Sequence, residues 1–165
     1  MVSKRFEFTP WLPWASRQQS PYKDKSGVYL IARFLKQPPS GPADPLEDEI
    51  VYIGESCKER LQSRWRSFDR AAFRDGKHRG GKKYKQLFGG TSTVLFVATF
   101  PDTDLVESFL TTGVSLLDIN RNSAKDVIDF DFLNEIDDLI VKYMERRLIL
   151  LYSLARGHRP LCNVD

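Results

Sequence analysis

The sequence predicts an α+β fold, because segments typical of strands and of helices both occur along 165 residues. Strand character is clear at 26–35, 49–54 and 91–100, and one long amphipathic helix is expected at 132–155. A chain of this length with 41% hydrophobic residues can build one core. We therefore expect a single domain over 1–165, with an N-terminal arm at 1–25 and a long insertion at 101–131 before the last helix.

The arm contains Trp11-Leu-Pro-Trp14, and the neighbouring prolines discourage a helix there. These indoles either pack as a lid on the core or contact a nucleic-acid base. The first predicted strand follows, and a loop with four prolines at 37–48 joins it to the second, which ends on Gly54. This order predicts a hairpin with a long loop.

A helix is expected at 57–73, because apolar residues recur there at spacings of three and four. A basic turn at 75–81 and a short helix at 82–88 lead to the third strand. Within the insertion we expect a helix at 104–110 and polar turns at 120–123. In the last helix, Asp131 or Asn134 is the expected N-cap and Gly157 the residue that ends it.

Positive charge is concentrated in one segment. Residues 55–88 contain eleven Lys or Arg and four Asp or Glu, whereas the whole chain has a net charge of only +3. Such a segment is typical of a surface that binds a phosphate backbone, although a solvated helix face produces the same pattern.

Several classes of protein are disfavoured by composition. No segment is apolar enough for a membrane span or a signal peptide, so we expect a cytoplasmic protein. Two cysteines and two histidines make a zinc site improbable, and two reduced thiols are expected. The segment 76–83 approaches a nucleotide-binding phosphate loop, but Lys83 replaces the required hydroxyl and the segment follows a helix.

Glu145 lies on the apolar face of the last predicted helix, since Val141, Leu148, Ile149 and Tyr152 are its neighbours at helical spacing. A buried carboxylate needs a compensating charge. An arginine in a salt bridge would supply it structurally. A hard cation such as Mg²⁺ would supply it functionally.

Five features in order resemble the GIY-YIG nuclease superfamily: Gly27-Val-Tyr29, Val51-Tyr-Ile-Gly54, Arg64 on a basic helix, Glu145 on a later helix and Asn163 near the end. The resemblance covers nearly the whole chain. It implies a small mixed sheet with three core strands flanked by helices. It also implies a magnesium-dependent DNA endonuclease, in which Mn²⁺ is expected to substitute for Mg²⁺.

The resemblance also implies a role for each residue. Tyr29 and Tyr52 would be the paired catalytic tyrosines, with Tyr29 the first choice of base. Arg64 would bind the phosphate and Glu145 the metal ion. His78 resembles a second histidine of some members, and catalysis, phosphate contact or a plain surface position remain open for it. The expected DNA-binding residues are Lys58, Arg60, Lys82, Lys83, Lys85 and Asn163.

Two positions depart from the family pattern. Glu55 stands where some members have a lysine, and Phe68 stands where many have a histidine or tyrosine. The proton-transfer residues are therefore open. The alternatives to a restriction-type endonuclease are a repair-type nicking nuclease and a DNA-binding protein of this fold without activity. A homodimer is expected if the protein makes double-strand cuts.

Overall fold

The computed structural model describes residues 7–101 and 130–164, and it has an α+β architecture. The predicted α+β class is therefore confirmed. The elements in chain order are β1 (Leu12–Pro13), the 3-10 helix η1 (Trp14–Gln19), β2 (Gly27–Arg33), β3 (Ile50–Ser56), α1 (Leu61–Phe73), α2 (Arg79–Phe88), β4 (Leu95–Pro101) and α5 (Phe130–Arg156).

The strands form one four-stranded sheet in the order β1-β4-β2-β3, and every neighbouring pair is antiparallel. The predicted hairpin of β2 and β3 is confirmed. The expectation of a mixed, three-stranded sheet is wrong in two respects. β3 and β4 do run in the same direction, but β2 lies between them, so no parallel ladder forms. The N-terminal arm also adds the two-residue strand β1.

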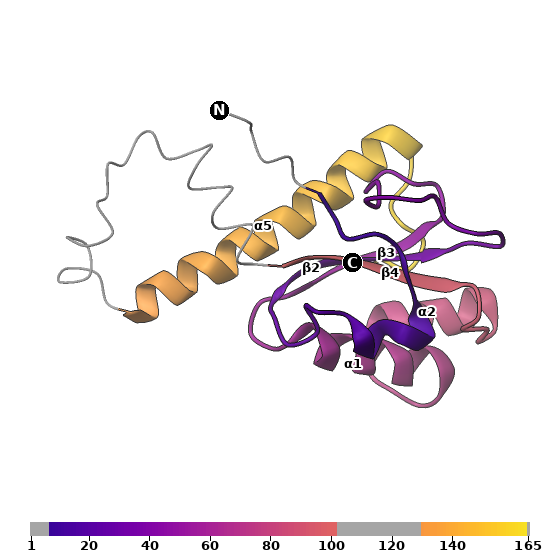
Figure 1. The fold of residues 1–165 in the computed structure, drawn as a ribbon, viewed down its shortest axis with the longest axis horizontal. Helices are drawn as coiled ribbons and strands as arrows, with labels where there is room; N and C mark the ends of the chain where they lie inside the picture. Colours follow the sequence, from indigo (N-terminus) through magenta and orange to yellow (C-terminus); the bar gives the residue numbers. More distant parts are fainter. Residues whose placement is uncertain (1–6, 102–129, 165) are drawn as a thin grey trace.

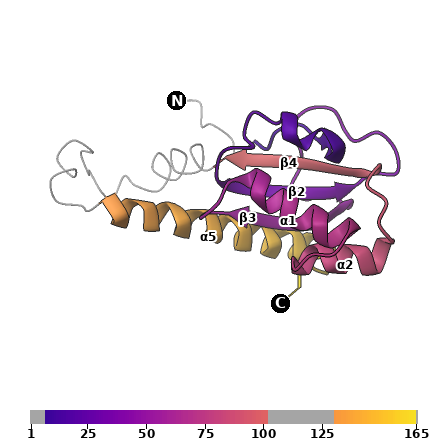
Figure 2. The same cartoon turned by 90° about the horizontal axis from the view of Figure 1, so that it is seen from below.

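Helices cover both faces of the sheet, with α5 on one side and the pair α1 and α2 on the other (Figure 1). Seen after a quarter turn, β4, β2 and β3 lie side by side with α1 in front of them (Figure 2). Residues alternate between two cores, as a pleated strand requires. Val28, Leu30 and Ala32 belong to the core under α5, and Tyr29 and Ile31 to the core under α1 and α2.

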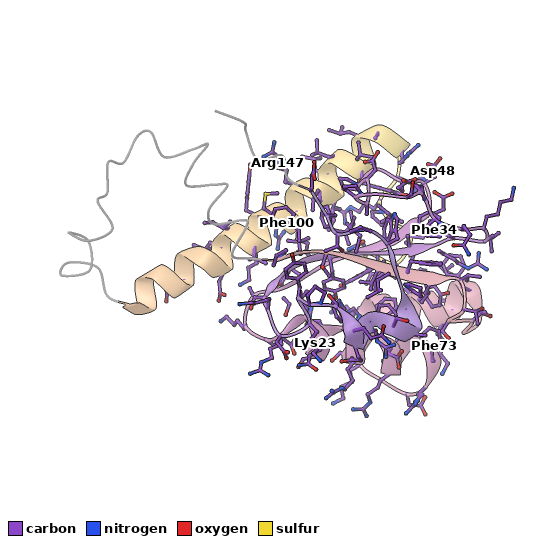
Figure 3. All side chains as sticks on the ribbon, viewed as in Figure 1. Lys23, Phe34, Asp48, Phe73, Phe100 and Arg147 are labelled. Carbon is purple, nitrogen blue, oxygen red and sulfur yellow. The ribbon has the colours of Figure 1, made fainter. Side chains whose placement is uncertain are left out.

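Aromatic residues show the same division. Phe34 and Phe100 belong to the core on the α5 side, whereas Phe73 packs against the other core, and all three are labelled in Figure 3. The apolar face of α5 around Glu145 is buried as predicted, because Val141, Leu148 and Tyr152 are each no more than 7% exposed.

The two tryptophans of the arm are core residues. Trp14 is 1% exposed and donates its Nε1 hydrogen to Asp69 at 2.8 Å, while Trp11 packs edge-on against Phe34. The lid interpretation is thereby confirmed. Neither indole is available to stack on a base.

Helix boundaries differ from the expected ones mainly at N-termini. α1 begins at Leu61 and α2 at Arg79, and α5 already includes Asp131 and Asn134, so neither of these caps it. Gly157 ends α5 with a φ of 74°, as predicted. Because Arg79–Lys83 are helical, 76–83 is no phosphate loop. The expected helix at 104–110 and the turns at 120–123 lie outside the described residues.

Both cysteines, Cys57 and Cys162, are free thiols. Among residues 7–101 and 130–164, no helix combines the length and apolar character that a membrane span needs.

Candidate active site

Tyr29 and Tyr52 lie on the same face of the β2–β3 hairpin, with ring centroids 6.0 Å apart. In the strand register, Tyr29 is opposite Gly54. The absence of a side chain at Gly54 makes room for both rings, since a Cβ there would lie 2.5 Å from Tyr52 Cε1 and 2.6 Å from Tyr29 Cζ. The glycine of the second tripeptide therefore holds the two phenols together.

The last described residues of the chain run along the outer edge of β3. The Cys162 N–H donates to the Val51 carbonyl at 2.8 Å. The Asn163 amide pairs with both backbone groups of Ile53: its Oδ1 accepts from the N–H at 2.9 Å and its Nδ2 donates to the carbonyl at 2.7 Å. Asn163 was expected to bind DNA. In this fold its amide instead fixes the strand that carries Tyr52.

Arg64, on the first turns of α1, is held beside the end of β3. Its Nε donates to the Glu55 carbonyl at 3.2 Å, and one terminal nitrogen lies 3.4 Å from a carboxylate oxygen of Glu59. The side chain is 32% exposed, so part of the guanidinium remains open to a ligand. Burial raises the pKa of both tyrosines, and the charge of Arg64 partly offsets this increase, which places that charge near them.

Glu145 is partly buried, and no ion pair or hydrogen bond to its carboxylate occurs within the described parts of the chain. Burial first, and repulsion from Glu55 second, raise its pKa to about 7. One oxygen of Glu55 is itself buried without a partner. The structural alternative, a salt bridge for Glu145, thus finds no support in the described residues.

Glu55 is a residue whose contribution sequence reasoning missed. In the sequence, Glu55 follows Gly54 and was noted only as a departure from the family pattern. Nothing in the sequence indicated that α5 brings Glu145 near it. The charges of Glu145 and Glu55 act on each other, and carboxylate oxygens are the ligands that a hard divalent cation prefers. No group of three or more His, Cys, Asp or Glu side chains within the described residues is arranged as a metal site, so Mg²⁺ would fit here with these carboxylates and water molecules as its ligands.

The environment of the tyrosines disfavours phenolate formation. Burial, followed by the charge of Glu145, raises the pKa of Tyr52 to about 12. Burial, followed by Tyr52, holds the pKa of Tyr29 well above 10, and Arg64 only partly offsets this. The charge of Arg64 favours the phenolate form, but burial and the neighbouring groups raise the pKa of both phenols by more. The Tyr29 side chain is fully buried, and its hydroxyl has no partner of acceptable hydrogen-bond geometry.

His78 is no plain surface residue, because its ring packs against Tyr52 and Phe68. It is the N-cap of α2: its Nδ1 accepts the Gly81 N–H at 3.2 Å. Burial, and then the charge of Arg64, lower the pKa of the ring to about 4. A neutral imidazole that accepts at Nδ1 carries its hydrogen on Nε2. His78 is thus a hydrogen-bond donor without a free basic nitrogen.

The expected DNA-binding cations fall into two groups. Arg60 pairs with Asp24 at 3.4 Å, and Lys85 donates to the Arg74 carbonyl at 2.7 Å and lies 3.8 Å from Asp75. These two have partners within the protein but are largely exposed, so their contact with DNA stays a prediction. The other group has no such contact in the described structure. It consists of Lys58, which precedes α1, and of Lys82 and Lys83 in α2.

A shallow hollow of about 710 Å³ adjoins this site on the side of α1. Its lining residues are Arg64, Ser67, Arg70, Asp75, Gly76, Lys77 and His78. Sequence reasoning proposed only the first and last of these. Arg70 and Lys77 lie in a run of many cations, and no local pattern distinguishes them from Arg66 or Arg74.

Substitution of Glu145 by glutamine separates a free carboxylate from one in a salt bridge. A carboxyl group whose folded pKa exceeds its unfolded pKa stabilises the fold only while it is protonated. Its contribution is complete below about pH 4.5 and is lost as the pH rises through about 7. We expect Glu145→Gln, without metal at pH 8, to raise the free energy of unfolding by about 1 to 3 kcal/mol.

Thermal unfolding in EDTA between pH 4.5 and pH 8 measures this effect. The difference between the two proteins should vanish near pH 4.5. The difference between the two proteins is compared because His78, whose pKa is lowered, makes the stability of both proteins rise with pH, which is opposite to the effect of Glu145. A variant that is less stable at pH 8 would show that Glu145 is held in a salt bridge.

No family model, curated protein or solved structure matches this chain. Any function must therefore be argued from the site itself.

Proposed function

We propose that the protein is a magnesium-dependent endonuclease that hydrolyses phosphodiester bonds of DNA. One observation carries the proposal: the partly buried carboxylate of Glu145, which has no ion pair or hydrogen bond within the described residues, lies within electrostatic range of Arg64 and of the buried pair Tyr29 and Tyr52. A cation site, a phosphate ligand and hydroxyl groups are what phosphodiester hydrolysis needs. The ordered motifs of a GIY-YIG nuclease support the same function.

Each residue has a defined task in this proposal. Glu145, with Glu55 beside it, would hold the metal ion. Bound Mg²⁺ supplies a Lewis acid and increases the acidity of coordinated water. Arg64 would donate its guanidinium hydrogens to the phosphate oxygens, where it stabilises the charge that develops on phosphorus.

The tyrosines would act as neutral phenols. Because the pKa of Tyr52 is about 12 and that of Tyr29 is also raised, a phenolate is rare at neutral pH. The Tyr52 phenol, the less buried of the two, can still accept a hydrogen bond from the attacking water and orient it, with Tyr29 beside it as a positioning residue. The proton of that water would pass to solvent. His78 would donate its Nε2 hydrogen to a phosphate oxygen. In this proposal neither Tyr29 nor His78 removes the proton of the attacking water, although Tyr29 was the first choice of base and catalysis was one role left open for His78.

Plasmid cleavage tests the proposal. The unmodified protein should convert supercoiled plasmid DNA to nicked or linear DNA with Mg²⁺ and with Mn²⁺, but not in EDTA. Glu145→Gln should reduce the rate by about 1,000-fold or more, since it removes a charged metal ligand. Glu135→Gln is the matched control, because Glu135 is exposed on the same helix.

The same experiment addresses the alternatives. Binding without cleavage by any of the three proteins, under all metal conditions, would establish a DNA-binding protein and end the enzyme proposal. Accumulation of nicked circles alone would indicate a nicking nuclease. Linear products would indicate double-strand cuts, for which we expect a homodimer with two active sites.

A further inference from the structure

The hollow beside the candidate active site holds two cations that no acidic group engages. Arg70 and Lys77 are both exposed, and neither forms an ion pair in residues 7–101 and 130–164. Arg64, which lies in both the hollow and the site, makes the two regions continuous. Positive charge therefore extends from the tyrosines along the exposed side of α1.

The charge of the hollow is suited to an anion. Its one acidic residue, Asp75, has a fully exposed carboxylate 3.8 Å from Lys85. His78 is neutral at pH 7, because its pKa is lowered to about 4. Three cations thus line the hollow against one carboxylate, and the hydroxyl of Ser67 adds a neutral donor.

The wall formed by residues 75–78 is fixed before any ligand binds. Gly76 packs directly on α1, since a Cβ there would lie 2.6 Å from the backbone nitrogen of Ala71. At the other end, the bond between His78 and Gly81 anchors the segment to α2. The backbone of Lys77, between these two points, is thereby held at the rim of the hollow, and its side chain is exposed. A site that is formed in advance loses little conformational entropy on binding.

We propose that this hollow binds a second phosphate group of the DNA strand, next to the one that is cut, through Arg70 and Lys77. The Arg70 guanidinium can form paired hydrogen bonds to a phosphodiester, and Lys77 contributes a point charge. Arg64 then binds the scissile phosphate, and the strand runs from the tyrosines along α1. This inference rests on the proposed function for its ligand, but it concerns binding and not cleavage.

Equilibrium binding of a labelled DNA duplex, in EDTA so that no cleavage occurs, tests the proposal. The double variant Arg70→Gln/Lys77→Gln should bind about ten-fold or more weakly at 0.15 M salt. The slope of log K against log salt should also decrease in magnitude by about 2, because two phosphate contacts are lost. Thermal unfolding should be unchanged, since both side chains are exposed.

The matched control is Lys36→Gln/Arg147→Gln, which removes the same charge elsewhere. Lys36 is exposed after β2, and Arg147 is exposed on α5, on the other side of the sheet from α1 (Figure 3). This variant should keep most of the affinity and of the salt dependence. Equal losses in both double variants would overturn the proposal, because net charge alone would then explain binding.

A competition experiment distinguishes a DNA strand from free phosphate. Inorganic phosphate at 10 mM should weaken DNA binding no more than chloride of equal ionic strength. Selective displacement from the unmodified protein, but not from Arg70→Gln/Lys77→Gln, would assign the hollow to free phosphate and refute the strand path.

The two proposals fail in different ways. Weak binding by Arg70→Gln/Lys77→Gln together with no cleavage by the unmodified protein would keep the subsite and reject the nuclease. Cleavage by the unmodified protein together with normal binding by this variant would keep the nuclease and reject the subsite.

Discussion

Tyr29→Phe is expected to leave the fold intact or slightly stabilise it while reducing the cleavage rate by about 100-fold or more. The Tyr29 hydroxyl is fully buried, and the Tyr52 hydroxyl, which lies near it, does not meet it with acceptable hydrogen-bond geometry. Removing an unpartnered buried hydroxyl changes the free energy of unfolding by about 0 to 1 kcal/mol in favour of the fold. A hydroxyl that positions Tyr52, the phenol beside it, for contact with the attacking water would in contrast be essential, and misplacement of such a group costs about 100-fold.

Tyr84→Phe is the matched control. Tyr84 is also fully buried, but its hydroxyl donates to the Thr91 carbonyl at 2.9 Å. Its loss should cost about 1 to 2 kcal/mol of stability and leave the cleavage rate of the folded protein unchanged. Chemical denaturation and single-turnover cleavage measure both quantities. A Tyr29→Phe protein that cuts at the normal rate would show that this phenol is only a core residue.

Gly54→Ala should remove most activity and also destabilise the protein. The added methyl group would lie 2.5 Å from Tyr52 Cε1 and 2.7 Å from the Tyr29 hydroxyl oxygen, so one or both rings must move. Overpacking of this kind costs about 1 to 3 kcal/mol. Displacement of catalytic groups by about 1 Å can lower a rate about 100-fold. Denaturation and cleavage under saturating Mg²⁺ are the measurements.

Gly89→Ala separates these two effects. Gly89 ends α2 with a φ of 67°, and no atom lies within 4 Å of the added Cβ. Its substitution should cost roughly 1 kcal/mol through backbone strain alone, with a normal cleavage rate. Comparable losses of activity in the Gly54 and Gly89 variants would mean that general instability, and not the tyrosine geometry, limits the reaction.

The parts of this fold that depend on local patterns were predictable. Runs of β-branched and aromatic residues located β2 and β3, and the proline-rich loop between them predicted the long-looped hairpin that brings Tyr29 and Tyr52 together. Helical spacing likewise placed Glu145 among buried neighbours on α5. In each case the decisive interactions lie within a few residues or within one hairpin.

Contacts between distant segments were not predictable. The Asn163 amide meets Ile53 across 110 positions of the chain. Lys77 and Lys85 look equivalent in a basic run, yet Lys85, on α2, donates to the Arg74 carbonyl at the C-terminus of α1. The position of β2 between β3 and β4, which makes the sheet antiparallel, depends on how α1 and α2 return the chain. Each outcome is decided by tertiary packing.

The pairing of Cys162 and Asn163 with β3 has a consequence for behaviour at high concentration. β3 is the edge of the sheet, and an uncovered edge strand offers free N–H and C=O groups to another polypeptide. Here the backbone of Cys162 and the side chain of Asn163 occupy these groups at Val51 and Ile53. The contact that orients Tyr52 also blocks strand addition, so loosening it would promote aggregation together with loss of the site.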